Sequence, residues 1–222
     1  MKAFDPIWEK IHSEQEWGKY PPEEIVRFVA RNLYRLDRPN TKVLEIGCGT
    51  GAITWYLARE GFDAFGVDGS ETAIGKGRQR LADERLAAHL SVGDVSKLDF
   101  KDAHFDAIID SAVIYAHTVG SIREILRECH RVLKNGGRFF SSGLFGTKCT
   151  GFGKGDKLEE FTFTHVPEGV FVNRGTVHFF NRDQIVRYWQ EAGFRNLKID
   201  TVERTDKDGS TTVHFFMVES ER

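Results

Sequence analysis

A short run of acidic and glycine residues is the part of this sequence best suited to hold a charged ligand. Glu45 ends an apolar stretch that starts at Val43, and Gly47, Gly49 and Gly51 follow it. A carboxylate at the end of a buried strand is costly unless a partner balances it, and here that partner could be a bound cation. Glycine allows positive φ and lets a ligand approach the backbone closely. The run therefore predicts a strand, a turn and a helix whose N-terminus faces a ligand.

Further acidic residues follow predicted strands, at the edge where open α/β sheets bind their ligands. The strands expected at 63–67, 87–92 and 105–110 are each followed or ended by one acid: Asp68, Asp94 and Asp110. The carboxyl ends of parallel strands meet at one edge of a sheet. We therefore expect these carboxylates to face the same ligand as the glycine turn.

The remaining chain alternates strand and helix patterns, which is typical of a doubly wound α/β sheet. Helices are expected at 70–86, at 121–133 and from Asn181 or Asp183 to Trp189, and strands at 138–142, 194–201 and 211–219. Asn135-Gly136-Gly137 is expected to close the second helix as a glycine cap. We interpret residues 1–222 as one domain, with an N-terminal lid and helix at 1–40 and a substrate-side insertion, including a short hairpin, at 143–180.

The glycine turn fits more than one kind of cofactor. Gly47-x-Gly49-x-x-Ala52 followed by Asp68 matches the fingerprint of dinucleotide-binding proteins, so an NAD-dependent oxidoreductase stays an alternative. Glu45 argues for a cation, because it would repel a pyrophosphate but attract an ammonium or sulfonium group.

Together with Gly51, Gly93-Asp94 and the run Leu133 to Gly137, these features resemble the class I S-adenosylmethionine-dependent methyltransferases of the small-molecule type, over residues 20–142. The resemblance implies a seven-stranded sheet of order 3-2-1-4-5-7-6, with its last strand antiparallel, and an N-terminal helical lid. It implies S-adenosylmethionine as cofactor and methyl transfer to an oxygen or nitrogen of a small molecule. A non-catalytic cofactor-binding module on the same fold stays a further alternative.

The resemblance also assigns contacts with the methionine and ribose of the cofactor. Glu45, Gly47 and Gly49 would hold the methionine end. Asp68 would accept hydrogen bonds from both ribose hydroxyls, and Gly69 is included with it as a cofactor contact.

A second group of assignments concerns the adenine and the floor of the site. Asp94 would accept a hydrogen bond from the adenine amino group, and the backbone N–H of Val95 would donate to a ring nitrogen. Asp110 and Ser111 would line the floor below the methionine. Without a cofactor, Asp94 would be read as a turn residue and Asp110 as a plain strand-end acid.

Fewer residues point to the catalytic and substrate side. A base is needed only if the acceptor atom carries a proton that must leave. His117, after the fourth strand, and His178, after the glycine-rich part of the insertion, are the candidates. Trp17 and Tyr20 are the candidate substrate contacts. We expect the N-terminal segment and the insertion to enclose the acceptor and exclude water.

Composition narrows the possible partners and surroundings of the chain. Of 222 residues, 40% are hydrophobic and 29% charged, and the formal net charge is -2, which gives no support for a nucleic-acid partner. The three cysteines form no CxxC pair, and we recognise no metal-ligand pattern. With no signal peptide or membrane-spanning run recognised, we expect a cytoplasmic protein with no membrane contact. The oligomeric state stays open.

Overall fold

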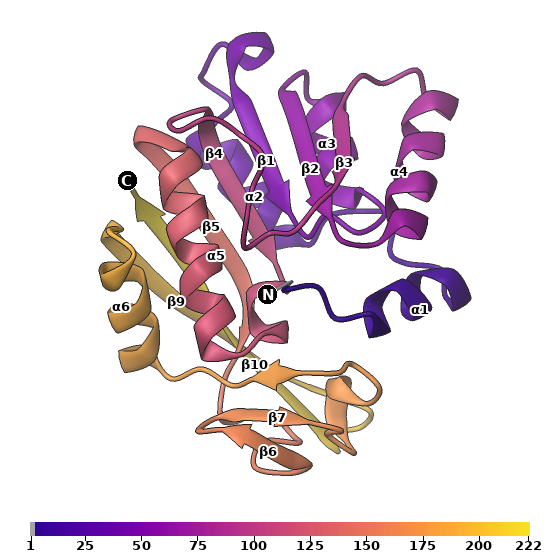
Figure 1. The fold of residues 1–222 in the computed structure, drawn as a ribbon, viewed down its shortest axis with the longest axis vertical. Helices are drawn as coiled ribbons and strands as arrows, with labels where there is room; N and C mark the ends of the chain where they lie inside the picture. The colour runs from indigo at the N-terminus through magenta and orange to yellow at the C-terminus, as the bar shows by residue number, and fades with distance from the viewer. Residues whose placement is uncertain (1–2) are drawn as a thin grey trace.

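A seven-stranded sheet forms the centre of the protein in a computed structural model, which describes residues 3–222 (Figure 1). Its strands are β1 (Lys42–Ile46), β2 (Asp63–Asp68), β3 (His89–Val92), β4 (Phe105–Ser111), β5 (Leu133–Phe145), β9 (Arg195–Asp206) and β10 (Thr211–Glu221). They lie in the order β3-β2-β1-β4-β5-β10-β9, and β10 is antiparallel to both of its neighbours. The predicted strand order and the antiparallel last strand are confirmed.

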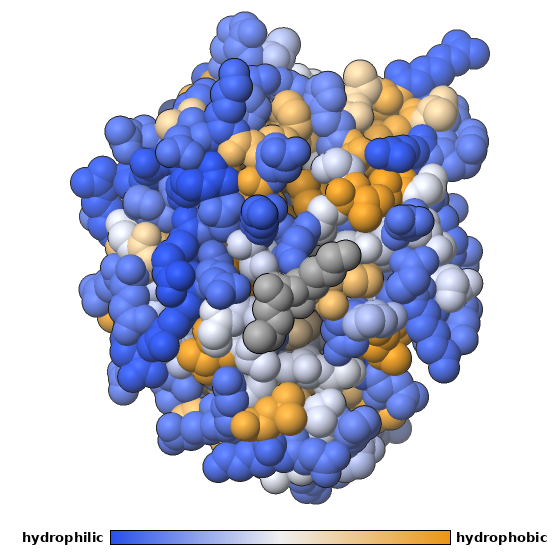
Figure 2. All heavy atoms as spheres, in the orientation of Figure 1, coloured by the Kyte–Doolittle hydropathy of each residue, from blue (hydrophilic) through white to orange (hydrophobic). Residues whose placement is uncertain are grey.

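Helices cover both faces of this sheet (Figure 1). They are α1 (Ile7–Glu14), α2 (Glu23–Asn32), α3 (Ala52–Arg59), α4 (Glu71–Asp83), α5 (Val119–Val132) and α6 (Arg182–Glu191), with short 3-10 turns η1 (Arg38–Asn40), η2 (Ile114–Ala116) and η3 (Gly169–Phe171). Figure 2 shows that one face of the molecule is mostly hydrophilic, with hydrophobic residues in small separate groups. No helix within residues 3–222 has the length and apolarity needed to cross a bilayer.

Alternation along each central strand explains why the sheet is covered on both faces. Val43 packs into a core with α2, α3 and α4, whereas the next residue, Leu44, packs into a core with α5 and α6. Phe140 and Phe139 on β5 divide between the two cores in the same way. Successive side chains of a strand point to opposite faces. A strand that is apolar on both sides therefore has to lie between two layers of helices.

The ends of several elements match the sequence signals. Ser70 caps α4, because its hydroxyl accepts a hydrogen bond from the N–H of Ala73. Asn181 caps α6 and forms a capping box with Gln184. The glycine cap expected after α5 is wrong. β5 begins directly at Leu133, and the N–H of Gly136 donates to the carbonyl of Arg222 at 3.0 Å.

Two segments lie outside the alternating pattern of strands and helices: the N-terminal segment with α1 and the insertion at 143–180. Both lie toward the carboxyl ends of the parallel strands. Figure 1 shows α1 and a small second sheet below the lower ends of β1 and β2. That sheet consists of β6 (Asp156–Glu159), β7 (Thr162–Thr164) and β8 (Val177–His178), all antiparallel. The insertion thus contains three strands where a hairpin was expected. Both segments are positioned to border a site at this edge.

Candidate functional site

The turn after β1 forms part of the wall of a cavity of about 380 Å³. Gly47, Gly49 and Gly51 have φ angles of 58°, 51° and 77°. A Cβ atom on Gly47 would lie 2.3 Å from Cγ2 of Val113, and one on Gly49 would lie 3.3 Å from Cε1 of His12. The turn therefore needs glycine both for its backbone conformation and for space, and it presents backbone rather than side chains to the cavity.

Asp68 lines the same cavity and fastens the turn to the sheet. Its Oδ2 accepts the N–H of Gly49 and its Oδ1 accepts the N–H of Ser70, each at 2.8 Å. Burial raises the pKa of Asp68, and these two hydrogen bonds oppose the rise. A carboxylate oxygen has a second lone pair, so Asp68 can still accept from a hydroxyl on the cavity side.

Glu45 is only 4% exposed and also borders the cavity. Its Oε2 accepts hydrogen bonds from the N–H of Thr54, at 2.7 Å, and from the Thr54 hydroxyl, at 2.5 Å. Burial raises its pKa to about 8, the bonds to Thr54 lower it, and the charge of Asp68 raises it. Glu45 therefore holds its proton more tightly than an ordinary glutamic acid does, and a cation beside it would favour the ionised form.

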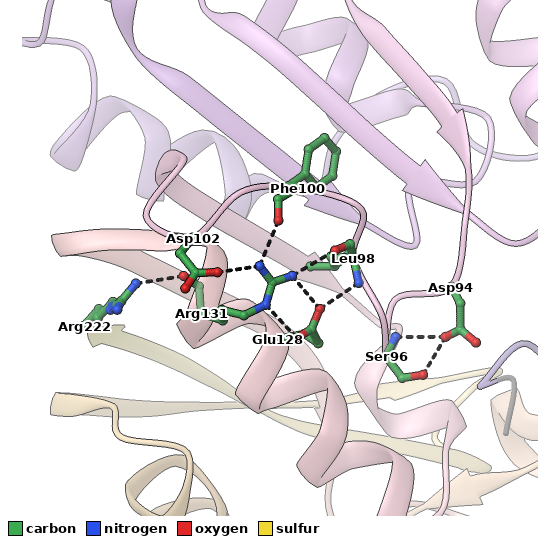
Figure 3. A network of polar contacts seen from close by, with 8 residues as sticks. All are labelled: Asp94, Ser96, Leu98, Phe100, Asp102, Glu128, Arg131 and Arg222. Atoms are coloured by element: carbon green, nitrogen blue, oxygen red, sulfur yellow. Dashed lines mark hydrogen bonds and ion pairs between the residues drawn. The ribbon is translucent and has the colours of Figure 1, made fainter.

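Asp94, after β3, is held from two sides. Its Oδ1 accepts the N–H of Ser96 at 2.9 Å and the Ser96 hydroxyl at 2.7 Å (Figure 3). Its Oδ2 accepts the backbone N–H of Ala3 at 3.0 Å. The N–H of Ala3 therefore already bonds to the carboxylate that the family resemblance assigns to the adenine amino group.

The loop that follows Asp94 is tied to α5 by one arginine. Figure 3 shows the guanidinium of Arg131 at the centre of this network. It donates to Glu128, to Asp102 and to the carbonyls of Leu98 and Phe100, with distances of 2.8 Å. Charge-assisted bonds of this kind are the strong ones, so the loop that carries Asp94 has a fixed place beside the sheet.

Phe4 lies next to Ala3 and covers Gly69. A Cβ atom built on Gly69 would lie 2.1 Å from Cδ2 of Phe4, so the ring rests directly on this glycine. The cavity is lined by Gly69 and Val95 and also by Ala3 and Phe4. Ala3 and Phe4 thus lie against Gly69 and Asp94, two residues that the resemblance assigns to the cofactor.

Asp110 and Ser111 end β4 but differ in where they face. Ser111 lines the cavity, whereas Asp110 is fully buried and does not. Asp110 accepts the N–H groups of Val113, at 3.0 Å, and Ile114, at 3.4 Å, and the hydroxyl of Ser141. Its geometry is that of a residue that shapes the turn after β4, rather than one that touches a ligand.

The two candidate bases lie in different places. His117 lines the cavity, and its Nδ1 is 3.0 Å from the carbonyl of Val113. Burial lowers its pKa, whereas hydrogen bonds with the backbone of Val113 and Ala3 and the charge of Asp94 raise it, so it lies near Ala3 and Asp94. His178 is fully buried, bonds to the hydroxyl of Thr162 at 2.7 Å and does not line the cavity.

Aromatic side chains from the N-terminal segment, from η2 and from the end of β5 line part of the same cavity. Trp17 and Tyr20 line it and are 40% and 73% exposed. Tyr115 and Phe145 line it from the sheet side, with their rings edge to face at 4.8 Å. The N-terminal segment and the residues around the insertion therefore face one cavity.

His12 lines the cavity although it was not among the site residues predicted from the sequence. His12, on α1, is 5% exposed and lies against Gly49, and its Nδ1 has no hydrogen-bond partner among the described residues. Burial lowers its pKa, and the charge of Asp68 raises it. Nothing in the local sequence marks His12, because its importance comes from the docking of α1 on the glycine turn. Within residues 3–222, no group of three or more acidic, histidine or cysteine side chains is arranged for a metal ion.

Comparison with known proteins finds similarity in both sequence and structure. Residues 43–137 match a family described as a methyltransferase domain. A demethylmenaquinone methyltransferase from Thermotoga maritima is 31% identical over 216 residues, which are 87% of this chain and 87% of that protein. Another, from Symbiobacterium thermophilum, is 34% identical over 150 residues, 62% of this chain and 56% of that protein.

A solved structure of an S-adenosylmethionine-dependent methyltransferase from Methanosarcina mazei has a TM-score of 0.72 at 20% identity, and the match covers 91% of this chain and 98% of that one. At this identity the likeness concerns the fold alone. Two of the curated relatives are matched over only about half of their length, 46% and 56%.

Proposed function

Because the chain belongs to the class I S-adenosylmethionine-dependent methyltransferases, we propose that it transfers a methyl group from this cofactor to an oxygen or nitrogen atom of a small molecule. The observation that carries the proposal is the continuity of one cavity. Glu45, Asp68 and the glycine turn line the same cavity as aromatic side chains that include Trp17 and Tyr20. Two relatives named as demethylmenaquinone methyltransferases support the small-molecule part of the proposal but not the choice of oxygen or nitrogen.

The residues at the strand ends fit the cofactor. When bound, it supplies a methyl group made electrophilic by a sulfonium. The backbone at Gly47 and Gly49 would border the methionine end, with Glu45 beside its ammonium group. Asp68 would accept from the ribose hydroxyls through its remaining lone pairs.

Asp94 and Val95 would bind the adenine once Ala3 and Phe4 have moved away. Gly69, which has no side chain, would leave room for the ring that Phe4 now fills. Ser111 would border the methionine, with Asp110 setting the turn that carries it.

The contribution of the chain to the reaction is mainly positioning. In-line displacement gains most from holding the acceptor atom close to the methyl carbon. Trp17 and Tyr20 would hold the acceptor from the N-terminal side, and Phe145 from the sheet. The same side chains would exclude water from the reacting groups.

We assign no general base. His178 does not line the cavity, and His117 lies near Ala3 and Asp94, the residue that the proposal assigns to adenine. An acceptor that arrives as a neutral amine or as an anion needs no base before it attacks.

Calorimetry tests the proposal first, with S-adenosylhomocysteine and NAD as separate ligands. We expect S-adenosylhomocysteine to bind more tightly, whereas tighter binding of NAD would support the oxidoreductase alternative. A screen of oxygen and nitrogen acceptors for S-adenosylhomocysteine release then tests turnover. Cofactor binding without release in any such screen would favour a non-catalytic module.

A further inference from the structure

One arginine of the insertion lies where the insertion contacts the N-terminal segment. Arg174 lies between η3 and β8, and its backbone N–H donates to the carbonyl of Phe171 at 3.1 Å. Gly175 follows with a φ of 71°, and a Cβ atom on it would lie 2.5 Å from Oδ2 of Asp5 and 3.0 Å from Cγ2 of Ile7. This turn is therefore packed closely against the start of α1. Arg174 lies at the contact between the insertion and the N-terminal segment.

The guanidinium of Arg174 lies over aromatic rings and lines the cavity. Its Cζ is 5.2 Å from the ring centre of Trp17 and 5.9 Å from that of Trp8. Both distances are within the range of cation–π attraction. The rings hold the positive charge beside Trp17, which the proposed function assigns to the acceptor.

Arg174 has no carboxylate within ion-pair distance in residues 3–222. The acids that line the cavity each accept a backbone N–H instead: Asp5 that of Ile7, Glu45 that of Thr54 and Asp68 those of Gly49 and Ser70. By contrast, Arg131 and Arg138 elsewhere in the chain each pair with carboxylates. The cavity therefore contains an arginine whose charge the chain itself leaves unpaired.

The electrostatic influence of Arg174 extends across the cavity. Burial raises the pKa of the Tyr115 hydroxyl to about 12, and the charge of Arg174 lowers it. The same charge is among the causes that lower the pKa of His12. Arg174 thus favours the anionic form of a group placed among these side chains.

The walls around this charge suit a flat ligand. Trp17, Tyr115, Phe145 and Val170 line the cavity together with Arg174. Aromatic side chains pack against planar groups by stacking and by edge contacts. We infer that the methyl acceptor is a planar, conjugated molecule carrying an anionic oxygen, a carboxylate or a phenolate, that pairs with Arg174.

This inference rests on the proposed function. It also states the charges of the two reacting groups, the acceptor oxygen and the sulfonium. The acceptor oxygen forms a bond to the methyl carbon while the carbon–sulfur bond breaks and its electron pair stays on sulfur. The negative charge of the oxygen and the positive charge of the sulfonium cancel. No proton has to leave during the step, which agrees with the lack of a well-placed base.

The test is calorimetry on the full chain saturated with S-adenosylhomocysteine, which prevents turnover. The probes are three carboxylates of increasing size, benzoate, 4-hydroxybenzoate and 1-hydroxy-2-naphthoate, each paired with its neutral amide. We expect at least one carboxylate to bind about tenfold or more tightly than its amide, the range for a charge-assisted hydrogen bond. Equal affinity within every pair, or no carboxylate bound at millimolar concentration, would overturn the inference.

Variants show whether the preference belongs to Arg174. Arg174→Met keeps the length of the side chain and removes its charge, so we expect it to abolish the preference. Arg174→Lys should keep part of it. Arg127→Met changes an exposed arginine on α5 and should keep it fully. A preference that survives in Arg174→Met, in a protein with unchanged melting temperature, would overturn the inference.

Turnover assays separate this inference from the proposed function. If neutral or cationic acceptors are methylated equally well by wild type and Arg174→Met, the function stands and the inference is wrong. If the carboxylate preference is found but no oxygen or nitrogen acceptor is methylated, the anion site stands and the proposed function is wrong.

Discussion

The backbone N–H of Ala3 donates a hydrogen bond of 3.0 Å to Oδ2 of Asp94, while the ring of Phe4 covers Gly69. On the proposed placement of the cofactor, Ala3 and Phe4 use an acceptor and a space that a bound adenine would need. The cofactor would then bind in competition with them, and part of its binding free energy would go into displacing this segment.

Phe4→Ala should therefore bind S-adenosylhomocysteine more tightly than wild type. Removing the ring empties the space over Gly69 and weakens the hold of the segment by about 1 kcal/mol, roughly fivefold in affinity. Calorimetry measures the change, with Phe4→Leu as a control that keeps most of the apolar contact. Weaker binding by Phe4→Ala would mean that the ring packs on the bound cofactor instead.

Asp68→Ala should weaken two properties at once. Cofactor affinity should fall by about 1.5–3 kcal/mol, the range for hydrogen bonds to a charged group. The melting temperature of the unliganded protein should also fall, because the N–H groups of Gly49 and Ser70 lose their acceptor. Asp68→Asn keeps one acceptor oxygen and should lose less of both. A lower melting temperature with unchanged affinity would leave Asp68 a purely structural role.

The affinity for S-adenosylhomocysteine should rise with pH because of Glu45. Burial raises the pKa of this carboxyl to about 8, and its ionised form attracts the ammonium group of the ligand. Between pH 6 and 8 the affinity should increase by at most about tenfold per pH unit. Glu45→Gln should bind more weakly and lose this dependence, and a slope unchanged in that variant would contradict the assignment.

The raised pKa of Glu45 should also make the stability of the unliganded protein depend on pH. Here the trend is opposite, because stability falls as the pH rises. The folded chain holds the proton of Glu45 more tightly than the unfolded chain does, so this contribution to stability is complete below the ordinary pKa of 4.5. It is lost as the pH rises through about 8. Glu45→Gln, which cannot ionise, should reduce the loss of unliganded stability between pH 6 and 8.

Acid should destabilise the protein through His178. Burial lowers its pKa to about 4, so the unfolded chain binds this proton more readily than the folded one. Stability from this group is complete above about pH 6.5 and is lost as the pH falls toward 4, by roughly 3 kcal/mol at most. Melting temperatures at pH 7 and 4.5 should differ less in His178→Gln than in wild type. His165→Gln, at an exposed histidine, is the control, and equal acid sensitivity of all three proteins would contradict this origin.

The sequence was sufficient for the sheet but not for the full cavity. A doubly wound sheet follows from apolar strands that alternate with helices, since each such strand must be covered on both faces. The order of the strands was implied by the family resemblance. Glycines with positive φ and acids at strand ends are local signals, so Gly47, Gly49 and Asp68 could be named in advance. Asp110 carried the same local signal, yet its carboxylate turns inward to Val113 and Ile114, a choice made by the backbone after β4.

Tertiary packing decides the parts that the sequence could not predict. His12 reaches Gly49 only because α1 docks on the turn, and no spacing within α1 records that contact. Arg174 lies over Trp17 although 157 positions separate them in the sequence. A single exposed-looking arginine has no local feature that distinguishes it from a solvated one.

Residues 3–20 supply four side chains that line the cavity: Ala3 and Phe4, which we propose make way for adenine, and Trp17 and Tyr20, which we propose contact the acceptor. On this proposal one continuous segment takes part both in admitting the cofactor and in completing the acceptor wall. Substrates should bind in a compulsory order, cofactor before acceptor, because the wall is complete only after the segment has resettled. Steady-state kinetics would then show S-adenosylhomocysteine to be competitive with S-adenosylmethionine and non-competitive with the acceptor, whereas random-order kinetics would mean that the two ends of the segment move independently.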